Sequence, residues 1–274
     1  MAEAVAVSRL VRKGEPMAVT IRRRRQNPDG TMTVVEHLTE LRSRLIISVA
    51  AVIVGMAIAW PLYRPVFNIL SNPFCSFMQH HPHLAQNPKN PCALVYLSVI
   101  EPFLVKIKLV GALGLVIALP VVLFELWEFV TPGLSLKERH YSIPFVVSSL
   151  VLFALGGFFA MLTLPKGLAF LLGFAGTQRV VAVLTIGKYL GFVTLLILAF
   201  GAAFEFPLLL ISLTLVGVLS SQKLRKWRRY SVVGIAIIAA VITPSQDWFT
   251  MTALMVPLLV FYEVSIIVAR LLHK

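Results

Sequence analysis

The chain has 274 residues, of which 58% are apolar and 14% charged, and its mean hydropathy is +0.86. A soluble domain has about a quarter of its residues charged, so this composition excludes a water-soluble globular protein and indicates one that crosses a membrane several times. The net charge of +13 is typical of chains that bind nucleic acid or an anionic membrane surface. In so apolar a chain we favour membrane lipid and expect no nucleic acid partner.

Residues 1–35 are expected to form a disordered, basic cytoplasmic tail. They contain four consecutive arginines, Arg22 to Arg25, and the turn-forming sequence Asn27-Pro28-Asp29-Gly30. No apolar core follows the arginines, so the segment is not a secretory signal peptide. A polar, charged segment of this kind favours disorder and contact with anionic lipid. The transmembrane domain is expected to occupy residues 36–270, with residues 271–274 as a short cytoplasmic tail.

Six apolar runs predict an all-α protein with six transmembrane helices. A span needs about 20 predominantly apolar residues, and four runs meet this length, at residues 45–63, about 103–130, 141–165 and 189–222. The fourth is interrupted only by Glu205 and Pro207, and we expect one long tilted helix that bends near the proline. Two shorter runs, at residues 230–242 and 248–262, predict either short spans or a re-entrant hairpin.

The distribution of basic residues predicts the orientation. Eighteen of the 25 Lys and Arg residues fall in the segments on one side of these spans, and seven fall on the other side or near its span ends. Because cytoplasmic loops carry the excess of Lys and Arg, we expect both termini in the cytoplasm. The basic excess is thus mainly a topology signal.

The long outer loop after the first span contains three histidines and the chain's two cysteines. We expect His80, His81 and His83 to be solvated, because no nearby carboxylate or thiolate arrangement completes a tetrahedral metal site. Cys75 and Cys92 match no zinc or C-x-x-C spacing. Either a disulfide between them or two free thiols is compatible with an outer, oxidising compartment.

Carboxylates lie where they are costly or surrounded by basic residues. Glu205 lies deep in the fourth run, where a charge costs at least about 2.5 kcal/mol. It is either a protonated group bonded to a neighbouring helix, or a functional contact to a partner helix, or a proton site. Glu40 and Arg44 form an i, i+4 pair before the first span, and Glu138 lies in the loop after the second. Such carboxylates serve in ordinary salt bridges or bind a cationic ligand, for which a guanidinium is the better geometric match.

Sequence motifs of enzymes are absent. The chain has no H-E-x-x-H, G-x-S-x-G, S-x-x-K, Walker A or G-x-G-x-x-G sequence. We therefore expect a protein that is not an enzyme, has no cofactor and draws its energy from elsewhere. The sequence contains no nucleophile or metal-binding motif that would support an intramembrane protease.

Several motifs resemble one family. The sequence His37-Leu38-Thr39-Glu40-Leu41-Arg42-Ser43-Arg44-Leu45 resembles the H-L-x-E-L-R-x-R-L signature of TatC, the polytopic subunit of the bacterial twin-arginine protein translocase. The resemblance continues in order from about Glu36 to Arg270, through Glu101-Pro102-Phe103 with Lys106-Ile107-Lys108, then Trp127, Phe129, Pro132, Leu134, Lys137, Glu138 and Arg139, then Phe204-Glu205-Phe206-Pro207, and Thr243-Pro244 with Asp247.

The resemblance implies a concave bundle of six helices, the last two short, in the bacterial plasma membrane. It implies recognition of Arg-Arg signal peptides and export of folded proteins with TatA-type and TatB-type single-span partners, driven by the proton motive force, and we expect self-association. It assigns signal-peptide binding to Glu40, Arg42, Phe129, Glu138 and Arg139. Contact with partner helices or a part in translocation falls to Phe103, Glu205, Pro207, Thr243 and Asp247, although Asp247 is also placed to cap the following helix.

One alternative from another class is a proton-coupled small-molecule transporter with Glu205 as the proton carrier. Transporters of this size are often built from internal repeats with a broken helix in each half. The first half of the chain holds no counterpart of Phe204-Glu205-Phe206-Pro207. This absence favours the translocase subunit.

Overall fold

The structure is a computed structural model that describes residues 34–81, 89–90, 92–130, 142–173, 184–244 and 247–271. These residues form seven α-helices and an isolated β-bridge between Val95 and Thr185. The predicted all-α fold is confirmed. The helices are α1 (Val34–His80), α2 (Glu101–Val130), α3 (Ser142–Gly173), α4 (Ile186–Phe204), α5 (Phe206–Leu215), α6 (Ser221–Ile242) and α7 (Trp248–Leu271).

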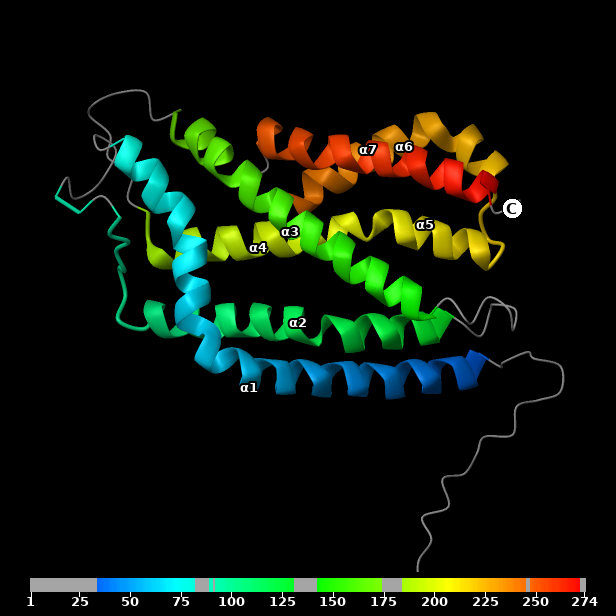
Figure 1. Ribbon diagram of the computed structural model, residues 1–274, viewed down its shortest axis with the longest axis horizontal. Coiled ribbons are helices and arrows are strands. Elements are labelled where there is room, and N and C mark those ends of the chain that lie inside the picture. Colours follow the sequence, from blue (N-terminus) through cyan, green and yellow to red (C-terminus); the bar gives the residue numbers. More distant parts are fainter. Residues whose placement is uncertain are drawn as a thin grey trace, which may run out of the picture.

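The helices pack side by side in an elongated bundle (Figure 1). The first half of α1 lies along α2, and α2 packs on α4, with α5 continuing in line after α4. Helix α3 crosses α4 diagonally, while α6 and α7 pack on each other and α7 also contacts α5. The start of α1 and the end of α7 lie at the same end of the bundle (Figure 1).

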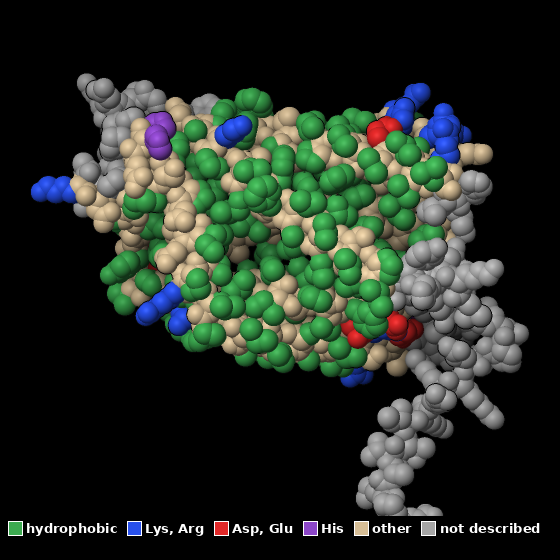
Figure 2. Space-filling model, in the orientation of Figure 1, with side chains coloured by type: hydrophobic (Ala, Val, Ile, Leu, Met, Phe, Trp, Pro, Cys, Tyr) green, Lys and Arg blue, Asp and Glu red, His purple; other side chains and the backbone are tan. Residues whose placement is uncertain are grey.

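Five segments are long and apolar enough to cross a membrane, and α4 with α5 counts as one of them. Apolar side chains cover most of the visible face between the two ends, where the charged groups gather (Figure 2). The fifth predicted segment, at residues 230–242, begins earlier in the structure, because α6 starts at Ser221 and its first half is basic. The Ser220 hydroxyl caps it by accepting the Lys223 N–H at 3.3 Å.

Helix α1 continues well past residue 63, the predicted end of the first span. It runs to His80 and contains Pro61, Pro65 and Pro73, and Figure 1 shows it turning sharply so that its second half crosses the end of the bundle. Prolines inside a helix kink it without always ending it. The second half buries apolar side chains against α4, and the Tyr189 hydroxyl donates to the Leu70 carbonyl at 2.8 Å. Much of the predicted outer loop is therefore helical, and this second half of α1 covers one end of the bundle. We call it the helical cap.

Other boundaries also differ from those predicted. Helix α3 ends at Gly173 and α7 at Leu271, beyond residues 165 and 262. The fourth span ends at Leu215, before residue 222, because Gly217 adopts a φ of +83° and turns the chain toward α6. With 22 and 24 residues, α6 and α7 are shorter than α1, α2 and α3, which have 47, 30 and 32.

Two glycines allow α1 and α2 to approach closely. A Cβ added at Gly55 would lie 2.3 Å from the Gly114 carbonyl oxygen, and one at Gly114 would lie 2.7 Å from the Met56 nitrogen. Small residues at a crossing let membrane helices bring their backbones together. This contact fixes how the polar ends of α1 and α2 meet.

Candidate functional site

The candidate site is a cluster of three carboxylates around one arginine, at the end of the bundle that holds the start of α1. Arg44 donates to Glu40 at 2.6 Å, to Glu125 at 3.0 Å and to Glu128 at 3.2 Å. Its Nε also donates to Glu40 at 3.1 Å. The Arg44, Glu40 and Glu125 side chains are 17%, 13% and 14% exposed, whereas Glu128 is 43% exposed. We call these four residues the carboxylate cluster.

Two helices build the carboxylate cluster from residues at helical spacing. Glu40 and Arg44 lie one turn apart on α1, and the predicted pairing between them is confirmed. Glu125 and Glu128 lie three residues apart near the end of α2 and therefore share a face. Because α1 and α2 pack side by side, this face meets Arg44.

Among the described residues, the carboxylate cluster holds more carboxylates than basic groups. The side chains of Glu40, Glu125 and Glu128 surround the single guanidinium of Arg44. The Oε2 atom of Glu40 is buried and has no hydrogen-bond partner among the described residues. A buried acceptor without a partner is costly, and a guanidinium offers five donors in a fork that matches carboxylates. The cluster is therefore suited to a second, cationic donor.

Aromatic rings flank the carboxylate cluster. Phe129 is half-buried and stacks on His37 with ring centroids 4.3 Å apart. Next to it on α2, Trp127 is 1% exposed and stacks on Phe145 of α3 at 4.1 Å. These contacts fix the last turns of α2, which carry Glu125 and Glu128.

The predicted signal-peptide residues are only partly described. Glu40 and Phe129 lie at the same end of the α1–α2 pair, and Arg42 is exposed on α1. Glu138 and Arg139 lie outside the described residues, as do residues 1–33 and 272–274, which contain most of the predicted tails.

Sequence reasoning missed Arg44, Glu125 and Glu128 as members of the site. Their charges near the ends of two spans are visible in the sequence, but which helices are neighbours is a tertiary fact. The feature of the sequence that could have indicated them is the i, i+3 pair of carboxylates at the end of α2. Two carboxylates near a membrane are costly unless a basic residue faces them.

Glu205 lies at the break between α4 and α5. Glu205 is both the C-cap residue of α4 and the N-cap residue of α5, and Pro207 follows in the first turn of α5. Proline has no N–H to donate to the preceding turn, which accounts for the interruption. The Glu205 Oε1 atom is buried without a hydrogen-bond partner among the described residues, and the carboxylate faces Ser149, which is wholly buried on α3.

The remaining predicted contact residues have diverse environments. Phe103 is 56% exposed in the first turn of α2. Thr243 is buried and donates to the Ala239 carbonyl of its own helix at 2.8 Å. Asp247 caps α7, because its Oδ1 accepts the Thr250 N–H at 2.8 Å and its Oδ2 accepts the Thr250 hydroxyl at 2.6 Å.

At the opposite end of the bundle, a disulfide joins Cys75 of α1 to Cys92, with Cα atoms 4.5 Å apart. The rings of His80 and His81 each bond to a carbonyl one turn earlier in α1, at 2.7 and 3.1 Å. His83 lies outside the described residues. Within the described ranges, no group of three or more metal-ligating side chains comes together.

Comparisons with known proteins agree on one family. Residues 36–257 match the family described as Sec-independent protein translocase protein (TatC). The TatC protein of Frankia casuarinae is 40% identical over 93% of this chain and 70% of its own length, and that of Aquifex aeolicus is 38% identical over 88% and 95%. A crystal structure of the twin arginine translocase receptor TatC superposes with a TM-score of 0.71 and 38% identity, covering 87% of this chain and 100% of that one. The chain therefore belongs to the TatC family of Sec-independent protein translocases, whose members are transport subunits and not enzymes.

Proposed function

We propose that this chain recognises Arg-Arg signal peptides at the cytoplasmic face of the bacterial plasma membrane, with both of its termini in the cytoplasm. It organises TatA-type and TatB-type single-span subunits, and further copies of itself, for the export of folded proteins driven by the proton motive force. The membership of the chain in the TatC family supports a role in this pathway. The transporter alternative loses its basis, because the family is one of protein translocases.

The carboxylate cluster is the observation that carries this proposal. Arg44 already occupies the geometry that a signal arginine needs, with its guanidinium between Glu40, Glu125 and Glu128. The Glu40 Oε2 atom, which is buried and has no hydrogen-bond partner among the described residues, favours the approach of a further guanidinium. Lysine is a weaker ligand for such a site, because it lacks the planar fork. The first signal arginine thus meets Glu40, and Glu138 receives the second from the loop after α2.

Phe129, Arg42 and Arg139 shape the same site in this proposal. The half-buried Phe129 ring supplies an apolar wall beside the carboxylates, and the two arginines set the local charge. Glu205, beside the break in the fourth span, offers a buried carboxylate oxygen to a polar residue of a partner helix. Exposed Phe103, together with Pro207, Thr243 and Asp247, belongs to the partner-facing or translocating surface. In this proposal the translocase domain comprises residues 36–270. Residues 1–35 and 271–274 are its N-terminal and C-terminal tails.

Export of a folded reporter with a twin-arginine signal peptide tests the proposal. We expect Glu40→Gln to reduce export at least tenfold, since losing a charge-assisted bond to a guanidinium costs about 1.5–3 kcal/mol. The matched control is Glu263→Gln, which removes the carboxylate paired with Arg228 in an exposed salt bridge elsewhere. Protein levels in the membrane are measured for both variants by immunoblot. Normal export by Glu40→Gln at a normal level would refute the assignment.

A further inference from the structure

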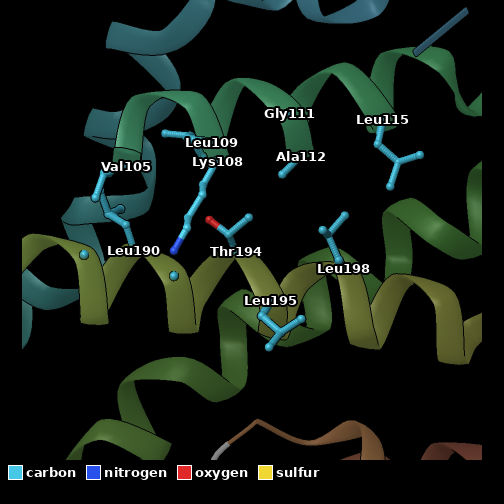
Figure 3. A pocket seen from close by; sticks show the side chains of 12 residues that line it. Val105, Lys108, Leu109, Gly111, Ala112, Leu115, Leu190, Thr194, Leu195 and Leu198 are labelled. Atoms are coloured by element: carbon cyan, nitrogen blue, oxygen red, sulfur yellow. The ribbon is translucent and has the colours of Figure 1, made fainter. Parts of the chain in front are cut away.

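A groove of about 360 Å³ lies between α2 and α4, outside the carboxylate cluster. Most of its lining is apolar, and Figure 3 shows Leu109 and Leu115 on α2 with Leu190 and Leu198 on α4. The groove lies between two segments that are long and apolar enough to cross a membrane, so we expect lipid around it.

Two glycines, which have no side chain, leave space in the groove. A Cβ added at Gly111 of α2 or at Gly191 of α4 would meet no atom within 4 Å. Both glycines line the groove, one on each wall. Toward the start of α2 the space closes, because a Cβ at Gly187 would lie 2.6 Å from the Glu101 carboxylate, which accepts the Gly187 N–H. The groove therefore narrows near Gly187 and is widest beside Gly111 and Gly191.

Lys108 is the only charged side chain among the residues that line the groove. It extends from α2 toward α4, and its nitrogen ends near α4 on the side of Thr194 (Figure 3). It makes no ion pair with any described residue. Two residues earlier, Lys106 has aromatic partners instead, since its Nζ lies 4.2 Å from the centre of the Trp60 ring and 5.7 Å from that of Tyr63. The two lysines thus face different neighbours.

The position of Lys108 corresponds to the level of lipid headgroups. It lies seven residues, or roughly 10 Å, after the start of α2, so its flexible stem can place the ammonium at the interface while its methylenes cover apolar surface. Exposed Lys188 lies in the first turn of α4, at the same end of the groove. A phosphate at this level would meet the ammonium groups of Lys108 and Lys188, while the nearby Glu101 carboxylate already accepts the N–H groups of Leu97 and Gly187.

The size of the groove favours an acyl chain over a protein helix. A helix is about 10 Å across, and a cylinder of that width would fill about 360 Å³ within roughly 5 Å, which is less than one turn. We propose that the α2–α4 groove binds one anionic phospholipid from the leaflet at the α1–α2 connection. Its phosphate pairs with Lys108, and one acyl chain lies along Gly111 and Gly191.

Lipid retention by the purified full-length chain tests this inference. The protein in detergent is titrated with phosphatidylglycerol or with phosphatidylcholine, and bound lipid is counted by native mass spectrometry. We expect one phosphatidylglycerol to be retained in preference, and Lys108→Gln to weaken its binding about fivefold, as expected for one basic residue near an anionic headgroup. Lys106→Gln is the matched control and should bind like the wild type. Equal retention of both lipids, or unchanged binding by Lys108→Gln, would overturn the proposal.

A second variant tests the acyl chain separately. Gly191→Leu fills the groove without a backbone clash, and Gly234→Leu on α6, where an added Cβ also meets nothing, controls for the added bulk. We expect the retained phosphatidylglycerol to be lost in the first variant and kept in the second. If Gly191→Leu instead displaces a co-purifying single-span subunit and leaves lipid occupancy unchanged, the occupant is a partner helix and the proposal is wrong.

Discussion

At the scale of single residues, charge placement in the sequence predicted part of the site. The Glu40–Arg44 spacing predicted an ion pair on one helix, which the structure contains at 2.6 Å. The two carboxylates of α2 were visible only as charges near a span end, because the pairing of α1 with α2 is decided by packing. The capping role of Asp247 was also predictable, since it precedes a helix by one residue.

Replacing Arg44 with methionine tests how far the carboxylate cluster depends on its arginine. We expect Arg44→Met to lower the free energy of unfolding by about 3 kcal/mol, because it leaves three partly buried carboxylates without their counter-charge. The measurement is the thermal unfolding midpoint of the purified protein in detergent.

The same change at an exposed ion pair supplies the control. Arg228→Met breaks only the surface bridge to Glu263, which is worth at most about 1 kcal/mol. Adding Glu125→Gln and Glu128→Gln to Arg44→Met should recover part of the lost stability. An Arg44→Met protein as stable as the wild type would show that the carboxylates do not need this arginine.

At the scale of helices, the apolar runs predicted which segments are helical but not where they end. The first span was predicted to end at residue 63, yet α1 continues through Pro61, Pro65 and Pro73 to His80. Burial of Phe74 and Leu70 against α4 outweighs the lost backbone bonds. In the fourth span, by contrast, the helix is interrupted close to Pro207, since α4 ends at Phe204 and α5 begins at Phe206, and proline has no N–H to donate to the preceding turn.

The crossing of α1 and α2 gives a prediction at this scale. Gly55→Ala should destabilise the protein by at least about 1 kcal/mol, because the new Cβ would lie 2.3 Å from the Gly114 carbonyl oxygen and the helices must move apart. Gly234→Ala, where the added Cβ meets no atom within 4 Å, should be neutral or slightly stabilising. Thermal unfolding in detergent compares the two, and equal midpoints would contradict a tight crossing.

At the scale of the whole molecule, composition predicted the class of protein. The mean hydropathy of +0.86 predicted a membrane protein, and five described segments have the length and hydropathy of spans. The start of α1 and the end of α7 lie at one end of the bundle (Figure 1). The basic first half of α6 was assigned to a loop, because charge hides a helix from a search for apolar runs.

The two ends of the molecule are chemically different. One carries the carboxylate cluster and the basic start of α6, whereas the other carries the disulfide and the helical cap formed by the second half of α1. This difference is what a subunit needs if it receives its ligand on one side of the membrane only. We propose that the end with the carboxylate cluster binds the signal peptide.

Site-specific photocrosslinking tests this proposal. A photoreactive amino acid replaces Phe129, beside the carboxylate cluster, or Glu205, within the fourth span, in membranes that contain the partner subunits. At position 129 we predict a crosslink to a precursor with an Arg-Arg signal, lost when the pair is changed to Lys-Lys. At position 205 we predict a crosslink to a partner helix. An equally strong crosslink from position 129 to the Lys-Lys precursor, or none to the Arg-Arg precursor while position 205 still captures a partner, would contradict the account.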